Sequence, residues 1–252
     1  MPVRIDEAAL GELTAPQFLD PRATSSELHT HLRSLIITGS IPPGTELNQA
    51  ELARRFKISR IPIREALKML QQEGLVDVQR NQRAVVRDLE ASEVDQLYGV
   101  RIALESLGAR ITAGRLTPEE AKDAKRCLRQ MRSAKRDGKM LSWIPLHRHF
   151  HSLCTARAGE PLARIILSYS ERSERYLRFA QQTHPDAFEV AEQEHIRILD
   201  ALIAGQPDHA GSLMAQHLAS TALRVLADLD GNVEGLSVQE ALNMACRGRQ
   251  DV

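Results

Sequence analysis

Residues 48–76 constrain the fold of this chain more than any other segment, because they read as two short helices separated by a sharp turn. Asn48 is a favourable N-cap for the first helix. Leu52 and Phe56 lie four residues apart and give this helix one apolar face. The segment therefore predicts a helix-turn-helix.

The second helix begins after Ser59, its predicted N-cap, and ends at Gly74. Pro62 is compatible with the first turn, because the N–H that proline lacks has no intrahelical partner there. Three apolar residues fall on one side of this helix: Ile63, Leu67 and Leu70. Three cations with the same spacing of four fall on another side: Arg60, Arg64 and Lys68.

A helix with a cationic outer face, held by a short helix before it, is the part of a helix-turn-helix that enters the major groove of DNA. Guanidinium groups near its N-terminal end reach phosphates or make paired contacts with guanine. The alternative is a solvated helix face, which is the usual fate of charges at this spacing. The fixed order of turn, cationic helix and following strands favours the DNA-binding interpretation.

Two β-like runs follow the second helix, over residues 75–79 and 84–87. Residues 80–83 between them read as the tip of a wing that can lie along the phosphate backbone. The positive charge of Arg83 at the end of this tip can add a phosphate contact. The strands and their connection complete the pattern of a winged helix.

Four segments carry a more specific signal: Pro42–Leu47, Glu51–Ala53, Ser59–Leu67 and Glu73–Val76. Together they closely resemble the winged-helix N-terminus of GntR-family bacterial transcription regulators. The resemblance implies a dimer that reads a palindromic operator in double-stranded DNA. We expect the DNA contacts to come from the helix-turn-helix and the wing, through Arg54, Ser59, Arg60, Pro62, Arg64, Lys68 and Arg83.

Length and charge agree with a two-domain DNA-binding protein. At 252 residues the chain exceeds the usual size of one domain. Its formal net charge is zero, yet residues 25–89 hold ten Lys or Arg against seven Asp or Glu, a local net charge of +3. Because so small an excess gives one copy only a weak electrostatic attraction to DNA, we expect a homodimer.

Cysteine usage and hydropathy bear on the compartment. Cys127, Cys154 and Cys246 are odd in number and widely spaced, which suits a reducing cytoplasm without a disulfide framework. No run approaches the roughly 20 apolar residues of a membrane span. Residues 1–20 lack the apolar core of a signal peptide. We therefore expect a cytoplasmic protein without a membrane partner.

The chain divides into a flexible arm (1–24), a winged helix-turn-helix domain (25–88), an all-helical domain (92–230) and a C-terminal tail (231–252) with a possible short helix. A helix is expected near the start of the second part, over residues 27–38. In the third part, helical periodicity predicts helices over 92–113, 117–137, 142–157, 162–181, 186–204 and 209–229. The expected fold is mainly α, an N-terminal winged helix-turn-helix plus a C-terminal all-α bundle.

Four of the nine histidines are placed as metal ligands would be. His147 and His151 lie four residues apart, so they project from one helix face. His195 and His217 are equally distant from the turn at Gln206 and should face each other across a helical hairpin. A single helical histidine is nevertheless more often an ordinary polar residue than a ligand. The spacing alone therefore leaves a metal site and two pairs of structural histidines as alternatives.

Residues 92–229 resemble the FCD domain, the all-helical effector domain of the FadR subfamily, in the segments Val100–Glu105, Phe150–His151, His195–Leu202 and His217–Leu218. Many such domains bind a divalent metal through an aspartate and three histidines. The resemblance implies metal ligands at His147, His151, His195 and His217. His147 stands where aspartate is common, and this neutral ligand favours Zn²⁺, with Ni²⁺ as the alternative, over harder ions.

Arg101 is a charged residue on an otherwise apolar stripe. One interpretation is an ion pair with Glu105, four residues further on. In the FCD domains that this chain resembles, an arginine here lies beside the ligand cavity, where a guanidinium can hold a carboxylate. The resemblance thus makes Arg101 the predicted contact for a small organic acid. Cys154 is either an additional soft ligand or, as we favour, a buried apolar cysteine.

The sequence favours a ligand-responsive transcriptional regulator, in this family usually a repressor, over two alternatives. A metal-dependent hydrolase needs an open coordination position and a general base. Residues 147–151 lack the glutamate of a His-Glu-x-x-His motif, and a hydrolase would leave the winged domain without a role. We therefore expect no enzymatic activity. The other alternative is a constitutive DNA-binding protein with a purely structural metal.

Overall fold

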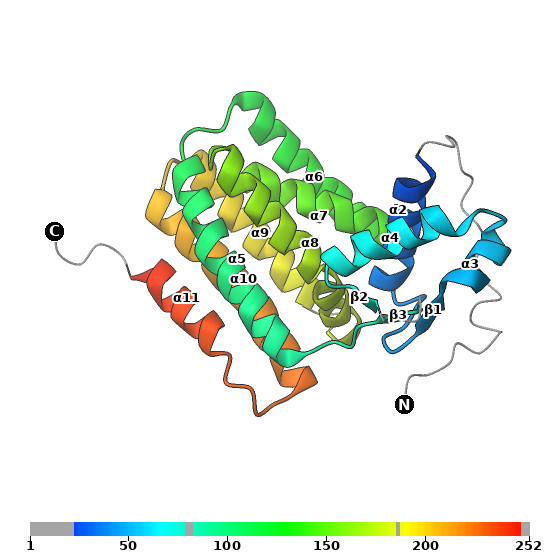
Figure 1. The fold of residues 1–252 in the computed structure, drawn as a ribbon. Coiled ribbons are helices and arrows are strands. Elements are labelled where there is room, and N and C mark those ends of the chain that lie inside the picture. Colours follow the sequence, from blue (N-terminus) through cyan, green and yellow to red (C-terminus); the bar gives the residue numbers. More distant parts are fainter. Residues whose placement is uncertain (1–22, 79–82, 185–186, 248–252) are drawn as a thin grey trace. The chain divides into compact units, whose positions relative to one another are not determined.

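The computed structural model describes residues 23–78, 83–184 and 187–247, and its contacts divide the chain into two units, before and after the peptide bond between Leu89 and Glu90. Of the predicted arm, residues 1–22 lie outside the described residues, as does most of the predicted wing tip, residues 79–82. Figure 1 shows the elements of both units in chain order. No helix in the described part of the chain combines the length and apolar character needed to cross a membrane.

The first unit is a winged helix-turn-helix. Its elements are α2 (Thr24–Ile37), β1 (Glu46–Asn48), α3 (Gln49–Phe56), α4 (Arg60–Gln72), β2 (Val76–Val78) and β3 (Arg83–Val86). The strands form an antiparallel sheet in the order β1-β3-β2, with Leu47 opposite Ala84 and Val76 opposite Val86. Side chains from α2, α3 and α4 share one apolar core with this sheet.

Local sequence signals set the ends of the two central helices. The Asn48 side chain accepts hydrogen bonds from the backbone N–H groups of Ala50 and Glu51, which confirms the predicted N-cap of α3. Lys57 ends α3 in the left-handed conformation (φ 54°) and so turns the chain toward α4. Ser59 occupies the N-cap position of α4, but its side chain makes no capping hydrogen bond.

Two details of this unit differ from the sequence-based expectation. The first helix begins at Thr24, three residues earlier than expected, with Ala23 at its N-cap. The three-residue strand β1 was not expected, because a strand this short has no periodicity of its own. Pairing with β3 creates it, through Leu47, whose side chain is fully buried.

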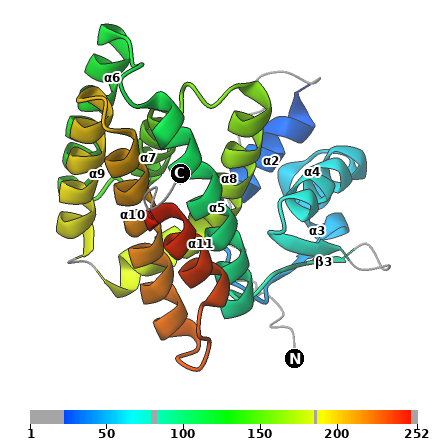
Figure 2. The same cartoon turned by 90° about the vertical axis from the view of Figure 1, so that its left-hand side faces the viewer.

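The second unit is a bundle of helices. Its elements are α5 (Ala91–Thr112), α6 (Pro118–Arg136), α7 (Met140–Cys154), α8 (Glu160–Thr183), α9 (Ala187–Ile203), α10 (Pro207–Leu229) and α11 (Leu236–Cys246). Within the bundle, α5 and α10 pack side by side and α11 lies against both (Figure 2). Thr117 and Glu120 form a capping box at the start of α6. The expectation of a mainly α chain with a winged helix-turn-helix and an all-α bundle is confirmed.

We predict that Asn48→Ala loosens the winged unit. Removing the side-chain acceptor leaves two N–H groups of α3 without their cap, which should lower the free energy of unfolding of this unit by about 1 kcal/mol. Hydrogen exchange at the amides of Leu52 and Phe56 in the full-length chain measures the loss. Asn48→Asp retains the acceptor and should exchange at nearly the wild-type rate. Equal protection in the alanine variant would contradict the capping role.

Candidate metal centre and nucleic-acid interface

The second helix of the helix-turn-helix, α4, separates apolar from cationic residues as the sequence predicts. It buries Ile63, Ala66, Leu67 and Leu70 against the core of the unit. The opposite side leaves Arg60, Arg64 and Lys68 exposed to solvent. Burial of the apolar side fixes the direction in which the cations project, so the helix presents a positive surface of the kind that a DNA groove accepts.

Carboxylates pair with most of these cations without burying them. Arg64 Nε and Lys68 Nζ lie 3.2 Å and 3.3 Å from Glu65 Oε1, and all three side chains remain well exposed. Such exposed pairs are weak, so a phosphate can replace the carboxylate at little cost. Arg54 on α3 pairs in the same way with Glu51. At the wing, Arg83 Nε lies 3.2 Å from Glu46 Oε1.

One exposed residue of α4 was missed in the sequence-based list. Ile61 is 63% exposed beside Arg60 in the first turn of the helix. An apolar side chain that is exposed to water gains no stabilisation from burial. The major groove offers an apolar partner in the methyl group of thymine. The signal was available in the sequence, because Ile61 falls off the stripe formed by Ile63, Leu67 and Leu70.

In the second unit the four predicted histidines converge. His147 and His151 come from α7, His195 from α9 and His217 from α10, and all four are buried. One ring nitrogen from each lies within 4.8 Å of those of the others. The Nε2 atoms of His195 and His217 are 3.1 Å apart, which confirms that these residues face each other across the α9–α10 hairpin.

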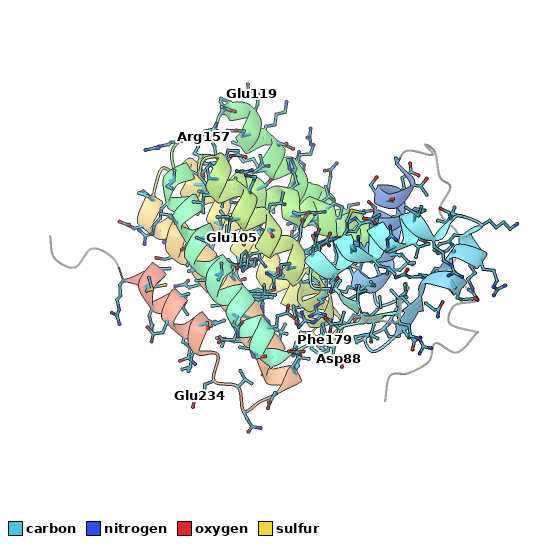
Figure 3. All side chains as sticks on the ribbon, viewed as in Figure 1. Asp88, Glu105, Glu119, Arg157, Phe179 and Glu234 are labelled. Carbon is cyan, nitrogen blue, oxygen red and sulfur yellow. The ribbon has the colours of Figure 1, made fainter. Side chains whose placement is uncertain are left out.

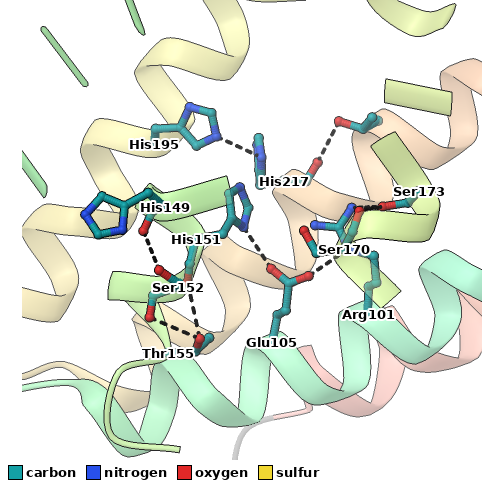
Figure 4. A network of polar contacts seen from close by, with 11 residues as sticks. Arg101, Glu105, His149, His151, Ser152, Thr155, Ser170, Ser173, His195 and His217 are labelled. Atoms are coloured by element: carbon teal, nitrogen blue, oxygen red, sulfur yellow. Dashed lines mark hydrogen bonds and ion pairs between the residues drawn. The ribbon is translucent and has the colours of Figure 1, made fainter. Parts of the chain in front are cut away.

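Two carboxylates hold the outer sides of this histidine cluster. Glu105 Oε2 on α5 lies 2.8 Å from His151 Nδ1 (Figure 4). Glu194 Oε2 lies 2.7 Å from His217 Nδ1. A carboxylate at Nδ1 fixes the ring orientation and leaves Nε2 free to bind a metal. Neither carboxylate was singled out as part of the site from the sequence, although Glu194 directly precedes His195.

Arg101 forms the ion pair with Glu105 that its spacing predicts. Its Nε donates to Glu105 Oε1 at 2.7 Å, and its Nη1 donates to Ser173 Oγ on α8 at 2.8 Å. Glu105, labelled in Figure 3, is fully buried. Although burial raises the pKa of Glu105, the Arg101 guanidinium and His151 hold this pKa at about 2. Glu105 is therefore ionised, and Arg101 acts on His151 through it.

Burial favours the neutral form of His147, His151 and His195. It lowers the pKa of His147 and His195 well below the usual value, and the neighbouring histidines lower both further. Burial also lowers the pKa of His151, against the opposing effect of Glu105. A neutral imidazole is the form that binds a metal ion, whereas the protonated form cannot.

These properties fit a divalent cation. Four imidazole nitrogen donors converge within the bundle, and two of their rings are oriented by carboxylates. His151 Nε2 is buried and has no hydrogen-bond partner among the described residues, which a coordinated metal would provide. The donor set suits Zn²⁺ or Ni²⁺ rather than Mg²⁺ or Ca²⁺, which prefer oxygen ligands.

A small hollow, partly open to solvent, adjoins the histidine cluster. His147, His195 and His217 line one part of it. Most of the other lining residues are apolar or aromatic: Trp143, Leu177, Ala180, Ala187, Phe188 and Ala191. Polar side chains also line it: Gln181, His184, Thr221 and Arg224. An apolar space with a few polar groups is typical of a small-molecule site.

Two polar side chains in the hollow have unused hydrogen-bonding capacity. Both amide atoms of Gln181 and the Nε of Arg224 are buried without a hydrogen-bond partner among the described residues. Arg101, in contrast, is not among the residues that line the hollow, and its role as a direct effector contact stays a prediction. Gln181 and Arg224 were missed in the sequence, where each looks like an ordinary polar residue of a long helix.

Comparison with protein families agrees with both units. Residues 24–86 match the family of bacterial regulatory proteins, gntR family, and residues 96–220 match the FCD domain. The fold and these matches define a DNA-binding transcriptional regulator with a helical effector domain. The chain belongs to the GntR family and carries an FCD domain.

Similar proteins of known sequence are transcriptional regulators rather than enzymes. The HTH-type transcriptional repressor RspR of Escherichia coli K12 is 27% identical over 207 residues, which cover 82% of this chain and 91% of that protein. The uncharacterized HTH-type transcriptional regulator YdhC of Bacillus subtilis is 27% identical over 69% of this chain and 78% of its own length. The gluconate operon transcriptional repressor of Bacillus licheniformis is 39% identical over 36% of this chain and 37% of that protein.

Solved structures share the fold. E. coli McbR/YncC gives a TM-score of 0.70 at 20% identity, over 82% of this chain and 99% of that chain. A putative transcriptional regulator GntR from Rhodococcus sp. RHA1 gives a TM-score of 0.68 at 22% identity, over 81% and 98% of the two chains.

We predict that the metal-free protein loses stability as pH falls from 8 toward 5. The pKa values of His147 and His195 are lower in the folded than in the unfolded state, so their contribution is present above the unfolded pKa of about 6.5 and declines below it. The loss should approach about 1.4 kcal/mol per pH unit for each histidine. Glu105, with a pKa of about 2, adds a further loss only below its ordinary value of 4.5.

Thermal unfolding of chelator-treated protein at several pH values measures this dependence. His195→Asn removes one titrating ring and should reduce the slope of stability against pH. A melting temperature that stays constant between pH 8 and pH 5 would show that the histidines are not buried in the neutral form.

Proposed function

We propose that this protein is a ligand-responsive repressor that binds palindromic operator DNA as a homodimer and senses a small carboxylate beside a bound divalent metal. The carrying observation is the cluster of four buried histidines that opens onto an apolar hollow in a chain with a winged helix-turn-helix. A purely structural metal would not need such a hollow. The cytoplasm, where operator DNA is accessible, is the proposed compartment.

Repression and dimer formation are supported by separate observations. RspR of E. coli and the gluconate operon regulator of B. licheniformis are both named as repressors. The net charge of only +3 over residues 25–89 favours two winged units acting together, because each added phosphate contact strengthens binding. A two-fold symmetric dimer matches a palindromic site.

The proposed metal ligands are His147, His151, His195 and His217, with Zn²⁺ as the first choice and Ni²⁺ as the alternative. The bound ion would supply a Lewis-acidic centre that attracts an anionic oxygen donor. The ligand set itself carries no negative charge, and Glu105 and Glu194 contact its outer side. The positive charge that remains at the centre favours an anion in the hollow.

The lining of the hollow indicates the rest of the effector. Trp143 and Phe188 supply aromatic walls, with their rings 5.6 Å apart in an edge-to-face arrangement. Arg224 and Gln181 supply donors, and Gln181 supplies an acceptor as well. We therefore propose a small organic acid with a second polar group and an apolar part. Arg101, whose buried Nη2 has no hydrogen-bond partner among the described residues, remains a candidate contact.

Helix α8 provides a route from the hollow toward the winged unit. Leu177 lines the hollow, and the adjacent Tyr176 is fully buried. The Tyr176 hydroxyl donates to Glu93 Oε2 at 2.6 Å and accepts from the backbone N–H of Glu90 at 3.4 Å. Because Glu90 is the first residue of the second unit, a shift of α8 around an effector would alter the anchoring of the segment that leads to the DNA-binding unit.

Arg64→Ala should weaken operator binding without unfolding the protein. Loss of a groove contact near the start of the recognition helix is expected to reduce the affinity by about 1–3 kcal/mol. Fluorescence anisotropy with an operator selected from random duplexes measures the change. Arg136→Ala, which removes an exposed cation from α6, is the matched control and should bind normally. Unchanged affinity of the Arg64 variant would remove this residue from the DNA contacts.

The double variant His195→Ala, His217→Ala should lose one equivalent of tightly bound metal. Two of the four donors are removed, and the two that remain belong to one helix face. Elemental analysis of purified, dialysed protein measures the stoichiometry, with circular dichroism as the check on folding. His209→Ala, an exposed histidine of α10, should retain the wild-type metal content. An unchanged metal content in the double variant would refute the proposed centre.

Tyr176→Phe should uncouple the effector from DNA binding. The substitution removes a hydroxyl that bonds Glu93 and Glu90, so the coupling free energy between effector and operator should fall by about 1 kcal/mol. Operator titrations with and without saturating effector measure the coupling. Metal content and effector affinity should remain close to wild type. Tyr169→Phe on the same helix is the control, and equal coupling in both variants would exclude this route.

A further inference from the structure

A second group of metal-ligating side chains lies between α6 and α7, apart from the buried histidine cluster. Asp123 and Cys127 occupy successive turns of α6, and His149 comes from α7. One ligand atom from each lies within 4.8 Å of the other two. The buried cluster accounts for none of these residues.

Helix α7 carries its three histidines on two sides. His147 and His151 point into the bundle, whereas the His149 ring turns away from His151 in Figure 4. His149 Nε2 lies 3.0 Å from Asp123 Oδ2. The two groups of ligands are therefore separate, although their histidines are only two residues apart.

The distances fit a small cation bridging the three donors. Cys127 Sγ lies 4.0 Å from Asp123 Oδ1, and His149 contacts the other oxygen of the same carboxylate. Zinc binds sulfur at about 2.3 Å and nitrogen or oxygen at about 2.0–2.2 Å, so pairs of ligand atoms around it stand about 3–4 Å apart. The three side chains need only small rotations to reach this arrangement.

The electrostatics of the group also favour a cation. The hydrogen bond from His149 and the Arg126 guanidinium hold the pKa of Asp123 below its usual range, so the carboxylate is ionised. Burial and the Asp123 charge raise the pKa of the Cys127 thiol. A divalent cation reverses this effect, because coordination deprotonates a thiol. Arg126 Nη2 lies 2.6 Å from Asp123 Oδ1, but its side chain is 61% exposed and can leave at little cost.

We infer that Asp123, Cys127 and His149 form a second, surface metal site for a borderline or soft divalent cation such as Zn²⁺. Carboxylate, thiolate and imidazole together are a donor set for this class of ion. Three protein ligands leave a fourth position for water or an exchangeable ligand. His149 is 49% exposed, so ions enter this site from solvent, in contrast to the buried cluster. An ion here joins α6 to α7.

Titration of the full-length protein with Co²⁺ tests the inference, because thiolate-bound Co²⁺ absorbs strongly in the near ultraviolet and the buried cluster contains no sulfur. The wild-type chain should develop this absorption, and Cys127→Ser should abolish it. His149→Ala should weaken Co²⁺ binding at the site by at least about tenfold, because even the loss of a residue that only supports a metal ligand lowers metal affinity by that factor. Competition with Zn²⁺ should remove the absorption.

Three controls assign the signal. Cys154→Ser and Cys246→Ser should retain the absorption, and so should the double variant His195→Ala, His217→Ala, which separates this site from the buried one. His149→Ala tests the site even if the Cys127 variant is unstable, because His149 is half exposed, and His209→Ala is its matched control. Absence of the near-ultraviolet absorption from wild-type protein, or its loss only with Cys154, would overturn the inference.

Discussion

One buried carboxylate, Glu105, organises the centre of the helical unit. It accepts a hydrogen bond from Arg101 and contacts the Nδ1 of His151, while Arg101 also reaches Ser173. These bonds tie α5, α7 and α8 together inside the bundle. An unpaired charge in such a place would destabilise the fold by about 3–5 kcal/mol, so each member of the network requires the others. The orientation of His151, and with it the histidine cluster, follows from this pairing.

Burial, rather than this network, favours the neutral form of His147 and His195 in the bundle. Burial excludes water, which lowers the pKa of His147 and His195 and keeps their nitrogens available as donors. The hollow beside them is apolar apart from a few polar groups, so under the proposed function an anionic effector would find its charge partners in the metal ion held by the histidine cluster and in Arg224. Helix α8 contributes both to this hollow and to the hydrogen bond at Glu90. Binding of an effector in the hollow and anchoring of the segment that leads to the winged unit can therefore depend on one another.

The DNA-binding unit follows a different physical rule. Its core is apolar and its cations remain at the surface in weak, exchangeable pairs, so a phosphate can replace Glu65 or Glu51 without disturbing the fold. Binding should therefore depend strongly on salt and on the number of winged units that act together.

The sequence by itself determined the elements and their faces. Asn48 and Thr117 mark helix starts through short-range hydrogen bonds. The spacing of four residues, which places Ile63 and Arg64 on different sides of α4, is a property of the helix alone. Even the meeting of His195 and His217 followed from counting residues on either side of a turn. Only the tertiary structure decided which polar groups share a site. Strand β1 exists through its pairing with β3, and Glu194, Gln181 and Arg224 gain significance from helices distant in the chain. The physical reason is that local propensity acts over one or two turns, whereas burial, which sets charge states and leaves polar atoms unpartnered, depends on the packing of the whole bundle.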